Sequence, residues 1–172
     1  MRTSSFALVF GIAYLAAGVL GLIPAALQPP PAGAPAESFG VLYGYLLGLF
    51  PVNVLHTAVH LAIGLWGIAA WSGAVSALGY ARSLALLYGA LAVMGMVPGL
   101  NTVFGFIPLH GHDVWLHAGT AAIAAYFGWR REAVAAERRN AAPERRKRPT
   151  VVAMDRRGGL PDRRGGHLPA DA

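Results

Sequence analysis

Two short polar stretches in an otherwise apolar sequence contain most of the side chains that could perform chemistry. They are NVLHTAVH, which ends at His60, and HGHDVWLH, which ends at His117, and together they hold five of the six histidines. Residues four apart lie on one face of a helix, about 6 Å apart along its axis. The spacing therefore predicts one helix face with His56 and His60 and another with Asp113 and His117.

Imidazole and carboxylate groups are ligands that divalent transition metals bind in proteins. If the two faces meet, they form a candidate metal site whose ligands would be His56, His60, Asp113 and His117. A second hypothesis is a b-type haem bound axially by one histidine from each helix, for which His60 and His117 are the best-matched pair. Both hypotheses require the two helices to be neighbours.

A third interpretation is a structural hydrogen-bond network with no bound ligand. Asp113 would accept a hydrogen bond from an imidazole, and Asn53 would cap the helix that begins after it. His110 and His112 precede the second polar face and are assigned a supporting role. Because an unpaired ionisable group inside a bilayer is costly, all three interpretations predict closely paired side chains.

No catalytic residue is predicted. The sequence has no cysteine and none of the motifs G-x-S-x-G, Walker A or H-E-x-x-H. Asp113 is the only carboxylate in the last three apolar segments, which leaves no second acid for acid–base catalysis. An ion-driven permease is disfavoured for the same shortage of buried charge. A binding or structural role is favoured over an enzyme.

The composition places these residues in a membrane protein. Hydrophobic residues make up 55% of the chain and charged residues 13%, about half the charged share of a soluble domain. Only four charged residues precede position 130, namely Arg2, Glu37, Arg82 and Asp113. This distribution disfavours both a soluble globular fold and a wholly disordered chain.

Four apolar segments are long enough to cross the hydrocarbon core, which needs about 20 residues. The predicted spans are residues 6–27, 52–71, 81–97 and 113–129. The predicted fold is all-α, an integral membrane four-helix bundle over residues 1–129. A shorter apolar piece, residues 39–50, has glycine at every fourth position and predicts a short interfacial helix that kinks into the second span at Pro51. The alternative is that this piece simply lengthens the second span.

The placement of arginine predicts the orientation of the spans, because cytoplasmic loops carry the excess of basic residues. Arg2 precedes the first span, Arg82 lies between the second and the third, and an arginine-rich tail follows the fourth. Both termini are therefore predicted to be cytoplasmic. The same orientation places both polar faces in the outer half of the bilayer. An alternative for the first span is a signal peptide cleaved after residues 34–36.

Residues 130–172 form a separate, basic region. They contain most of the 14 lysine and arginine residues and two copies of the sequence DRRGG. Such a composition cannot bury a core, so a disordered cytoplasmic tail is predicted. Anionic lipid is a possible partner, since it attracts each nearby basic residue by about 1 kcal/mol. No nucleic-acid partner is expected, and a solvated tail that sets the topology is the simplest interpretation.

The polar stretches also carry a resemblance to a known family. The sequence GLFPVNVLHTAVHLAIG leads into the second span, PGLN ends the third, and HDVWLH opens the fourth. This combination resembles the small bacterial membrane proteins of domain of unknown function 4383 over roughly Phe6–Trp129. The most specific matches are Asn53, His56, His60, Asp113 and His117. The resemblance implies a four-span bundle in the bacterial inner membrane, and it implies no activity, cofactor or ligand.

Overall fold

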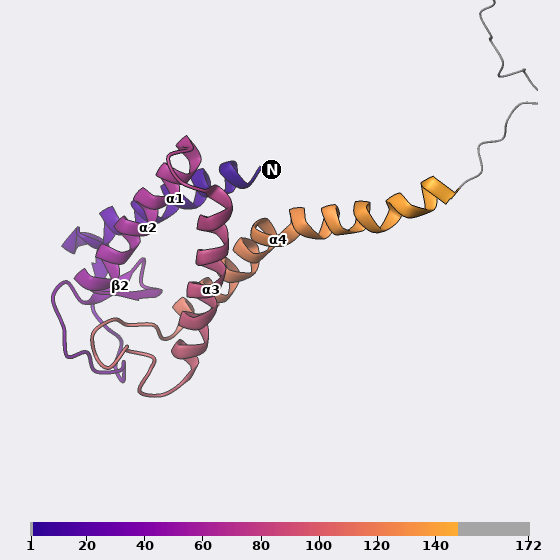
Figure 1. The fold of residues 1–172 in the computed structure, drawn as a ribbon. Helices are drawn as coiled ribbons and strands as arrows, with labels where there is room; N and C mark the ends of the chain where they lie inside the picture. The colour runs from indigo at the N-terminus through magenta and orange to yellow at the C-terminus, as the bar shows by residue number, and fades with distance from the viewer. Residues whose placement is uncertain (1, 148–172) are drawn as a thin grey trace, which may run out of the picture. The chain divides into compact units, whose positions relative to one another are not determined.

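The computed structural model describes residues 2–147 of the chain, including the side chains of residues 2–130. Four α-helices dominate it, and a small sheet forms between the first and the second (Figure 1). The elements in chain order are α1 (Thr3–Gly21), the 3-10 helix η1 (Pro24–Ala26), β1 (Leu27–Gln28), β2 (Gly44–Leu46), β3 (Phe50–Val52), α2 (Val54–Ser72), α3 (Ala77–Met96) and α4 (His112–Lys147). Each predicted span overlaps one helix, so the predicted helical bundle is confirmed.

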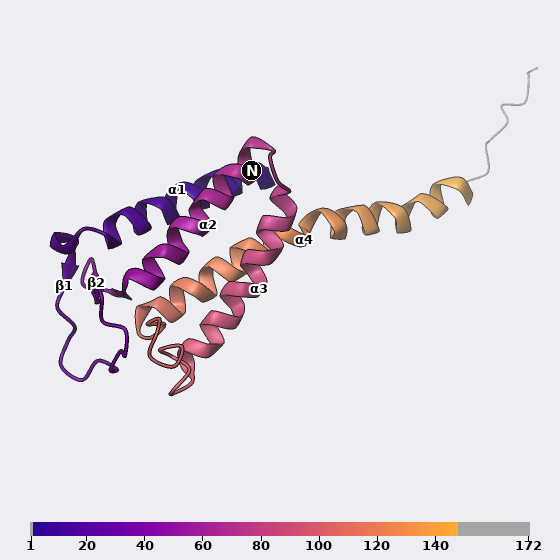
Figure 2. The same cartoon turned by 60° about the vertical axis from the view of Figure 1, so that its left-hand side comes forward.

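Helices α1 and α2 pack against each other along their length, and α3 and α4 form the other side of the bundle (Figure 2). The close approach of α1 and α2 depends on Gly11, Gly64 and Gly67. A Cβ atom on Gly67 would lie 2.7 Å from the Cα atom of Gly11, and one on Gly64 would lie 2.7 Å from the backbone nitrogen of Leu15. Small residues at a crossing let two helix backbones come into contact, as is common between membrane helices.

The interior of the bundle is rich in aromatic residues, whereas its outside is largely aliphatic. The buried core includes Phe6, Tyr14, Ile63, Tyr80, Leu84, Tyr88 and Phe127. Outward-facing aliphatic side chains occur on all four helices, for example Ile12, Leu65, Leu86, Val93 and Ile123. Helices α1, α2 and α3 are each long and apolar enough to cross a membrane. An apolar surface on this scale suits contact with lipid rather than with water.

The first half of α4 runs antiparallel to α3 over the depth of the bundle. Near the start of α4, Val114 lies against Gly95, where a Cβ atom would be 2.8 Å from the Val114 side chain. Four turns later, the carbonyl of Gly128 accepts a hydrogen bond of 3.0 Å from Nε of Arg82, near the start of α3. Residues 114–128 of α4 therefore cover the same depth as the apolar helix beside them.

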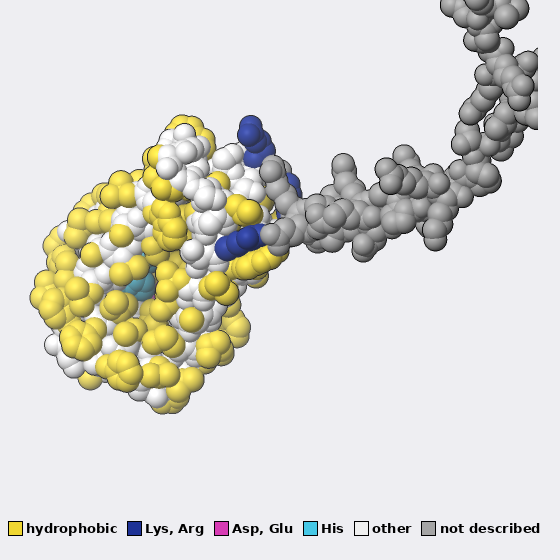
Figure 3. Space-filling model, viewed as in Figure 1, with side chains coloured by type: hydrophobic (Ala, Val, Ile, Leu, Met, Phe, Trp, Pro, Cys, Tyr) yellow, Lys and Arg dark blue, Asp and Glu magenta, His cyan; other side chains and the backbone are white. Residues whose placement is uncertain are grey.

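The two ends of the bundle differ in charge. Arg2 precedes α1, and Arg82 lies near the start of α3. Arg130 lies at the same end, because the carbonyl of nearby Phe127 accepts a hydrogen bond of 3.5 Å from Thr3 Oγ1 at the start of α1. Figure 3 shows the Lys and Arg side chains of the visible face gathered at one end, whereas the rest of that face is mainly apolar. We call this end the arginine end, and we call the opposite end, which carries the three strands, the sheet end.

Residues 39–50 do not form the predicted interfacial helix, and they do not lengthen α2. They contain β2 and the turn to β3, in an antiparallel sheet of order β1-β2-β3. Leu47 and Gly48 have φ angles of 56° and 71°, which a right-handed helix cannot contain. Gly44 allows strand contact instead of forming a helix face, because a Cβ atom there would lie 2.9 Å from a side chain of β1. Pro51 lies within β3 and kinks no helix.

The helical part of the chain extends further than predicted. Helix α4 continues to Lys147, whereas the fourth span was predicted to end at residue 129, and the disorder of the basic tail stays a prediction. The physical reason is local, because alanine, glutamate and arginine, all strong helix formers, make up most of this segment. The rest of the predicted tail, residues 148–172, lies outside the described residues.

Candidate metal centre

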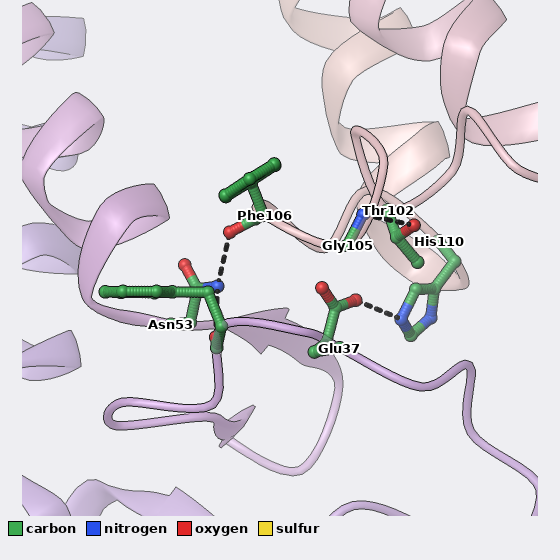
Figure 4. Close-up of polar contacts among 7 residues, drawn as sticks. Glu37, Asn53, Thr102, Gly105, Phe106 and His110 are labelled. Atoms are coloured by element: carbon green, nitrogen blue, oxygen red, sulfur yellow. Dashed lines mark hydrogen bonds and ion pairs between the residues drawn. The ribbon is translucent and has the colours of Figure 1, made fainter.

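Asn53 anchors the start of α2 and ties two loops to it. Its side-chain oxygen accepts a hydrogen bond from the backbone N–H of His56 at 2.9 Å, which is the predicted helix cap. Its side-chain nitrogen donates to the carbonyls of Phe39 at 3.1 Å and Phe106 at 2.7 Å (Figure 4). The side chain is fully buried. Asn53 therefore fixes where His56 lies relative to both loops, which exceeds the capping role predicted from the sequence.

The first polar face lies where the spacing predicted it. His56 and His60 are both buried on α2, and their ring centroids are 4.5 Å apart. The imidazole of His56 also lies near the backbones of Pro51 and Pro108. These two prolines are fully buried, Pro51 in β3 and Pro108 in the segment before α4, so they come from the two different parts of the chain at the sheet end. The ring of His56 therefore lies beside both loops.

The second polar face occupies the first two turns of α4. Asp113 and His117 are both buried, and Nε2 of His117 lies 3.5 Å from Oδ2 of Asp113. An acidic residue in the first turn of a helix is stabilised by the helix dipole, which favours Asp113 at this position. The predicted pairing of Asp113 with His117 is thus present, at a distance longer than a hydrogen bond.

The two faces meet inside the bundle. The ring centroids of His56 and His117 are 6.1 Å apart. His56, Asp113 and His117 each offer one ligand atom, and these three atoms lie within 4.8 Å of one another. His60 lies beside this set, through its ring contact with His56, but does not belong to it. We call these four residues the histidine cluster.

Four polar atoms of the histidine cluster are buried without a hydrogen-bond partner among the described residues. They are the Nδ1 atoms of His56, His60 and His117 and the Oδ2 atom of Asp113. Buried polar groups in proteins are almost always partnered, and leaving one unpartnered costs about 1–3 kcal/mol. The cluster therefore concentrates several unused donors and acceptors at one place.

Two tyrosines that the sequence analysis did not single out line the cluster. The ring of Tyr88 lies 5.0 Å from that of His117, and the ring of Tyr14 lies 5.4 Å from both His60 and Tyr88. The hydroxyl of Tyr14 donates to Oγ1 of Thr120 at 3.4 Å. The signal available in the sequence was a tyrosine in the middle of an apolar span, away from the interfacial positions that tyrosine prefers.

Above the cluster, two loops form the sheet end of the bundle. We call residues 28–53 and 97–111 together the cap. Their backbones are joined because Ser38 and Phe39 both donate to the carbonyl of Gly105, at 2.9 and 3.1 Å. Gly105 has a φ angle of 89°, and a Cβ atom there would lie 2.5 Å from the Ser38 side chain. The cap is therefore a packed structure in which two loops distant in sequence are connected.

The cap contains an ionisable pair that was only half predicted. His110 was assigned a supporting role, and its Nε2 atom lies 3.8 Å from Oε1 of Glu37, which the site prediction did not include. Burial raises the pKa of Glu37 to about 7 and lowers the pKa of His110 below its usual value. The sequence did contain a signal for Glu37, because it is the only acidic residue before Asp113. His112, the other supporting residue, is exposed and contributes to neither group.

The protein is a helical bundle in which three apolar helices are long enough to span a membrane. A fourth helix packs with them around a buried cluster of histidine and aspartate, so the class is that of a helical-bundle membrane protein. The family model "Domain of unknown function (DUF4383)" matches residues 5–130, and the chain belongs to this family. The match covers the bundle and both polar stretches, which confirms the resemblance. No curated protein and no solved structure matches the sequence.

Proposed function

We propose that the protein is a four-span membrane protein that binds one divalent transition-metal ion at His56, Asp113 and His117. The observation that carries this proposal is the convergence of three buried ligand atoms from two helices within 4.8 Å. Two imidazoles and one carboxylate suit zinc or ferrous iron and leave further coordination positions open. His60, 4.5 Å from His56 between ring centroids, is the nearest further imidazole.

The distances favour a metal over a network of direct hydrogen bonds. The 3.5 Å separation between His117 Nε2 and Asp113 Oδ2 exceeds the usual hydrogen-bond range. It matches the spacing of about 3.4 Å expected for two ligands that each lie about 2.1 Å from one tetrahedral ion. A structural network, the second candidate function, would in addition leave His56 Nδ1 without a hydrogen-bond partner among the described residues.

The packing favours an ion over a haem. A haem between His60 and His117 would need room for a flat macrocycle beside both rings. The rings of Tyr14 and Tyr88 are packed 5.4 Å from each other and within 5.4 Å of these two histidines. An ion needs only the space among the three ligand atoms, which lie within 4.8 Å of one another.

The membrane arrangement follows from the helices and the arginines. Helices α1, α2 and α3 have membrane-spanning length and hydropathy, and residues 114–128 of α4 lie alongside α3 over the same depth. A fourth span is therefore proposed over residues 113–129. Because basic residues favour the cytoplasmic side, the arginine end faces the cytoplasm and the sheet end faces outward in the bacterial inner membrane. Residues 130–172 then form a basic cytoplasmic region able to approach anionic lipid.

Metal content of the purified full-length protein tests the proposal. After chelation and incubation with Zn²⁺ or Co²⁺ followed by gel filtration, we expect about one ion per chain by elemental analysis, and Co²⁺ should give a visible absorption band. His56→Gln and Asp113→Asn should each weaken binding by more than about 100-fold, beyond the effect of losing an outer partner of a ligand. The matched control is His112→Gln, which removes an exposed imidazole next to Asp113 and should bind normally.

Three results would separate the candidate functions. Equal metal content in wild type and His56→Gln would contradict the proposed site. A Soret band in protein purified from haem-supplied cells would support the haem instead. A wild type that retains no ion at all would favour the structural network, in which the cluster only packs the bundle.

A further inference from the structure

A second pair of metal-ligating residues lies in the cap, outside the histidine cluster. Glu37 comes from the loop between β1 and β2, and His110 from the loop that leads into α4. Figure 4 shows the carboxylate of Glu37 pointing toward the ring of His110. The Glu37 side chain is 1% exposed and that of His110 is 10% exposed. Two side chains of the types that bind metals are thus buried together, and each comes from a different segment of the chain.

The pair is not satisfied by the protein around it. Both carboxylate oxygens of Glu37, Nε2 of His110 and the hydroxyl of Tyr43 are buried without a hydrogen-bond partner within the described part of the chain. The 3.8 Å between Glu37 Oε1 and His110 Nε2 is too long for a hydrogen bond. It is near the spacing of about 3.4 Å between two ligands of one tetrahedral ion. An unsatisfied ligand atom of each residue therefore lies within 3.8 Å of the other.

The position of this pair places it on the outer side of the histidine cluster. His110 lies three residues before Asp113, in the loop that leads into α4. The ring of Tyr45 lies 6.2 Å from that of His110, and Tyr45 pairs with Pro51 in the sheet. The backbone of Pro51 in turn lies near the imidazole of His56. Tyr45 and Pro51, both buried in the cap, therefore lie between neighbours of the pair and of the cluster.

The charge of the cap also favours a cation at this place. Glu37 is the only charged residue in residues 28–53 and 97–111, which contain no lysine or arginine. In its ionised form this carboxylate attracts cations and raises their local concentration, and a bound cation in turn favours the ionised form. Its combination with a neutral imidazole selects transition-metal ions over calcium or magnesium, which prefer oxygen ligands alone.

We propose that Glu37 and His110 form an outer site for a divalent transition-metal ion, through which an ion from outside reaches the histidine cluster. Two protein ligands bind an ion weakly, with water in the other positions, so the ion can exchange onward to the three ligands of the cluster. This inference rests on the proposed function, because an outer site of this kind needs an inner site to supply. Glu37 and His110 then determine how fast the ion is loaded, and the histidine cluster determines how much ion is finally bound.

Loading kinetics of the full-length protein in proteoliposomes test this inference. Co²⁺ is added outside the vesicles, and its visible absorption at the cluster is followed with time. Glu37→Gln and His110→Gln should each slow loading by about 10-fold, while the final absorbance is unchanged, since the first removes the carboxylate that attracts the cation and the second removes a ligand of the outer site. The matched control is again His112→Gln, an exposed histidine of the same segment, which should load at the wild-type rate.

A second measurement detects the outer site directly. In His56→Gln, where the cluster is disabled, we expect weak residual Co²⁺ binding that disappears in the double variant His56→Gln with Glu37→Gln. Thermal unfolding of each variant checks that the bundle is intact, and His110→Gln serves if Glu37→Gln does not fold.

Each of the other outcomes would contradict either the outer site alone or the outer site together with the proposed function. Wild-type loading rates in both cap variants would overturn the outer site but leave the cluster as the metal centre. Faster loading together with a lower melting temperature would show that the pair is a latch between the two loops. A wild type that binds no Co²⁺ would overturn both the outer site and the proposed function.

Discussion

The imidazole rings of His56 and His117 face each other between α2 and α4, with their centroids 6.1 Å apart. Each ring lies one helical turn from a residue that positions it, because Asn53 caps the helix before His56 and Asp113 precedes His117. Both rings are buried, and rigid helices carry both. A geometry held in this way is preorganised for a ligand that both rings contact at once.

Replacing Asn53 tests the link between the cap and α2. Asn53→Ala removes the helix cap and both hydrogen bonds to the carbonyls of Phe39 and Phe106, so we expect a loss of about 2–4 kcal/mol in the free energy of unfolding. Denaturant titration in detergent micelles measures it. The control is Ser76→Ala, which removes only the exposed cap of α3 and should cost about 1 kcal/mol. Equal losses in the two variants would show that the two loop hydrogen bonds contribute nothing.

Glycine at the crossing of α1 and α2 is expected to be essential for close packing. A Cβ atom on Gly67 would lie 2.7 Å from Cα of Gly11 and 2.8 Å from the carbonyl oxygen of Ala7. Backbone atoms cannot yield as a flexible side chain can, so Gly67→Ala should destabilise the bundle by about 1–3 kcal/mol. Gly119→Ala is the matched control, because a Cβ atom there meets nothing within 4 Å in the described part of the structure. A melting temperature for Gly67→Ala at or above that of the control would contradict this contact.

Glu37 should give the metal-free protein a characteristic pH dependence. Its pKa is raised from 4.5 to about 7 by burial, so between these values the folded protein keeps a proton that the unfolded chain has lost. Stability should therefore fall as pH rises from about 4.5 to about 7, and it should level off above that. The groups that face this carboxyl are His110, Tyr43 and Tyr45, and the lowered pKa of His110 acts in the opposite direction.

Comparison with Glu37→Gln isolates this effect, because His110 is present in both proteins. The melting temperature of Glu37→Gln relative to wild type, measured with a chelator present, should increase from pH 4.5 to pH 7 and then stay constant. A difference between the two proteins that does not change with pH would contradict the raised pKa of Glu37.

The proposed topology can be tested with single cysteines, because the chain has none of its own. A membrane-impermeant maleimide should label Ala36→Cys in intact spheroplasts, since this exposed residue lies at the sheet end. Ala74→Cys, exposed between α2 and α3, and Ala172→Cys should be labelled only after the membrane is opened. Labelling of Ala172→Cys from outside, with Ala74→Cys protected, would mean that α4 does not cross and that the chain has three spans.

Local sequence patterns were sufficient to predict the helices and their polar faces. The spacing of His56 with His60 and of Asp113 with His117 determines which side chains share a helix face, because the helical repeat is the same in every helix. Apolar length predicted the three helices that can cross a membrane, and the positions of Arg2 and Arg82 predicted that they lie at one end of the bundle. These features depend only on neighbours along the chain.

The path of residues 39–50 could not be obtained from such patterns. Glycine at every fourth position fits a helix face, yet Gly44 and Gly48 are needed where β2 approaches β1 and where the chain turns with positive φ. That requirement arises from a strand partner at Leu27 and Gln28, distant along the chain. A local repeat therefore suggested a helix where a long-range contact selects a sheet.

The sequence by itself determined that the chain forms apolar helices with two polar faces and that its arginines lie at one end. Only the tertiary structure decided that His56 rather than His60 joins Asp113 and His117, and that Glu37 meets His110. The physical reason is that the rotation of each helix about its axis depends on backbone contacts such as that between Gly11 and Gly67. The course of each loop depends on hydrogen bonds such as those of Asn53. Neither is visible in the spacing of residues within one segment.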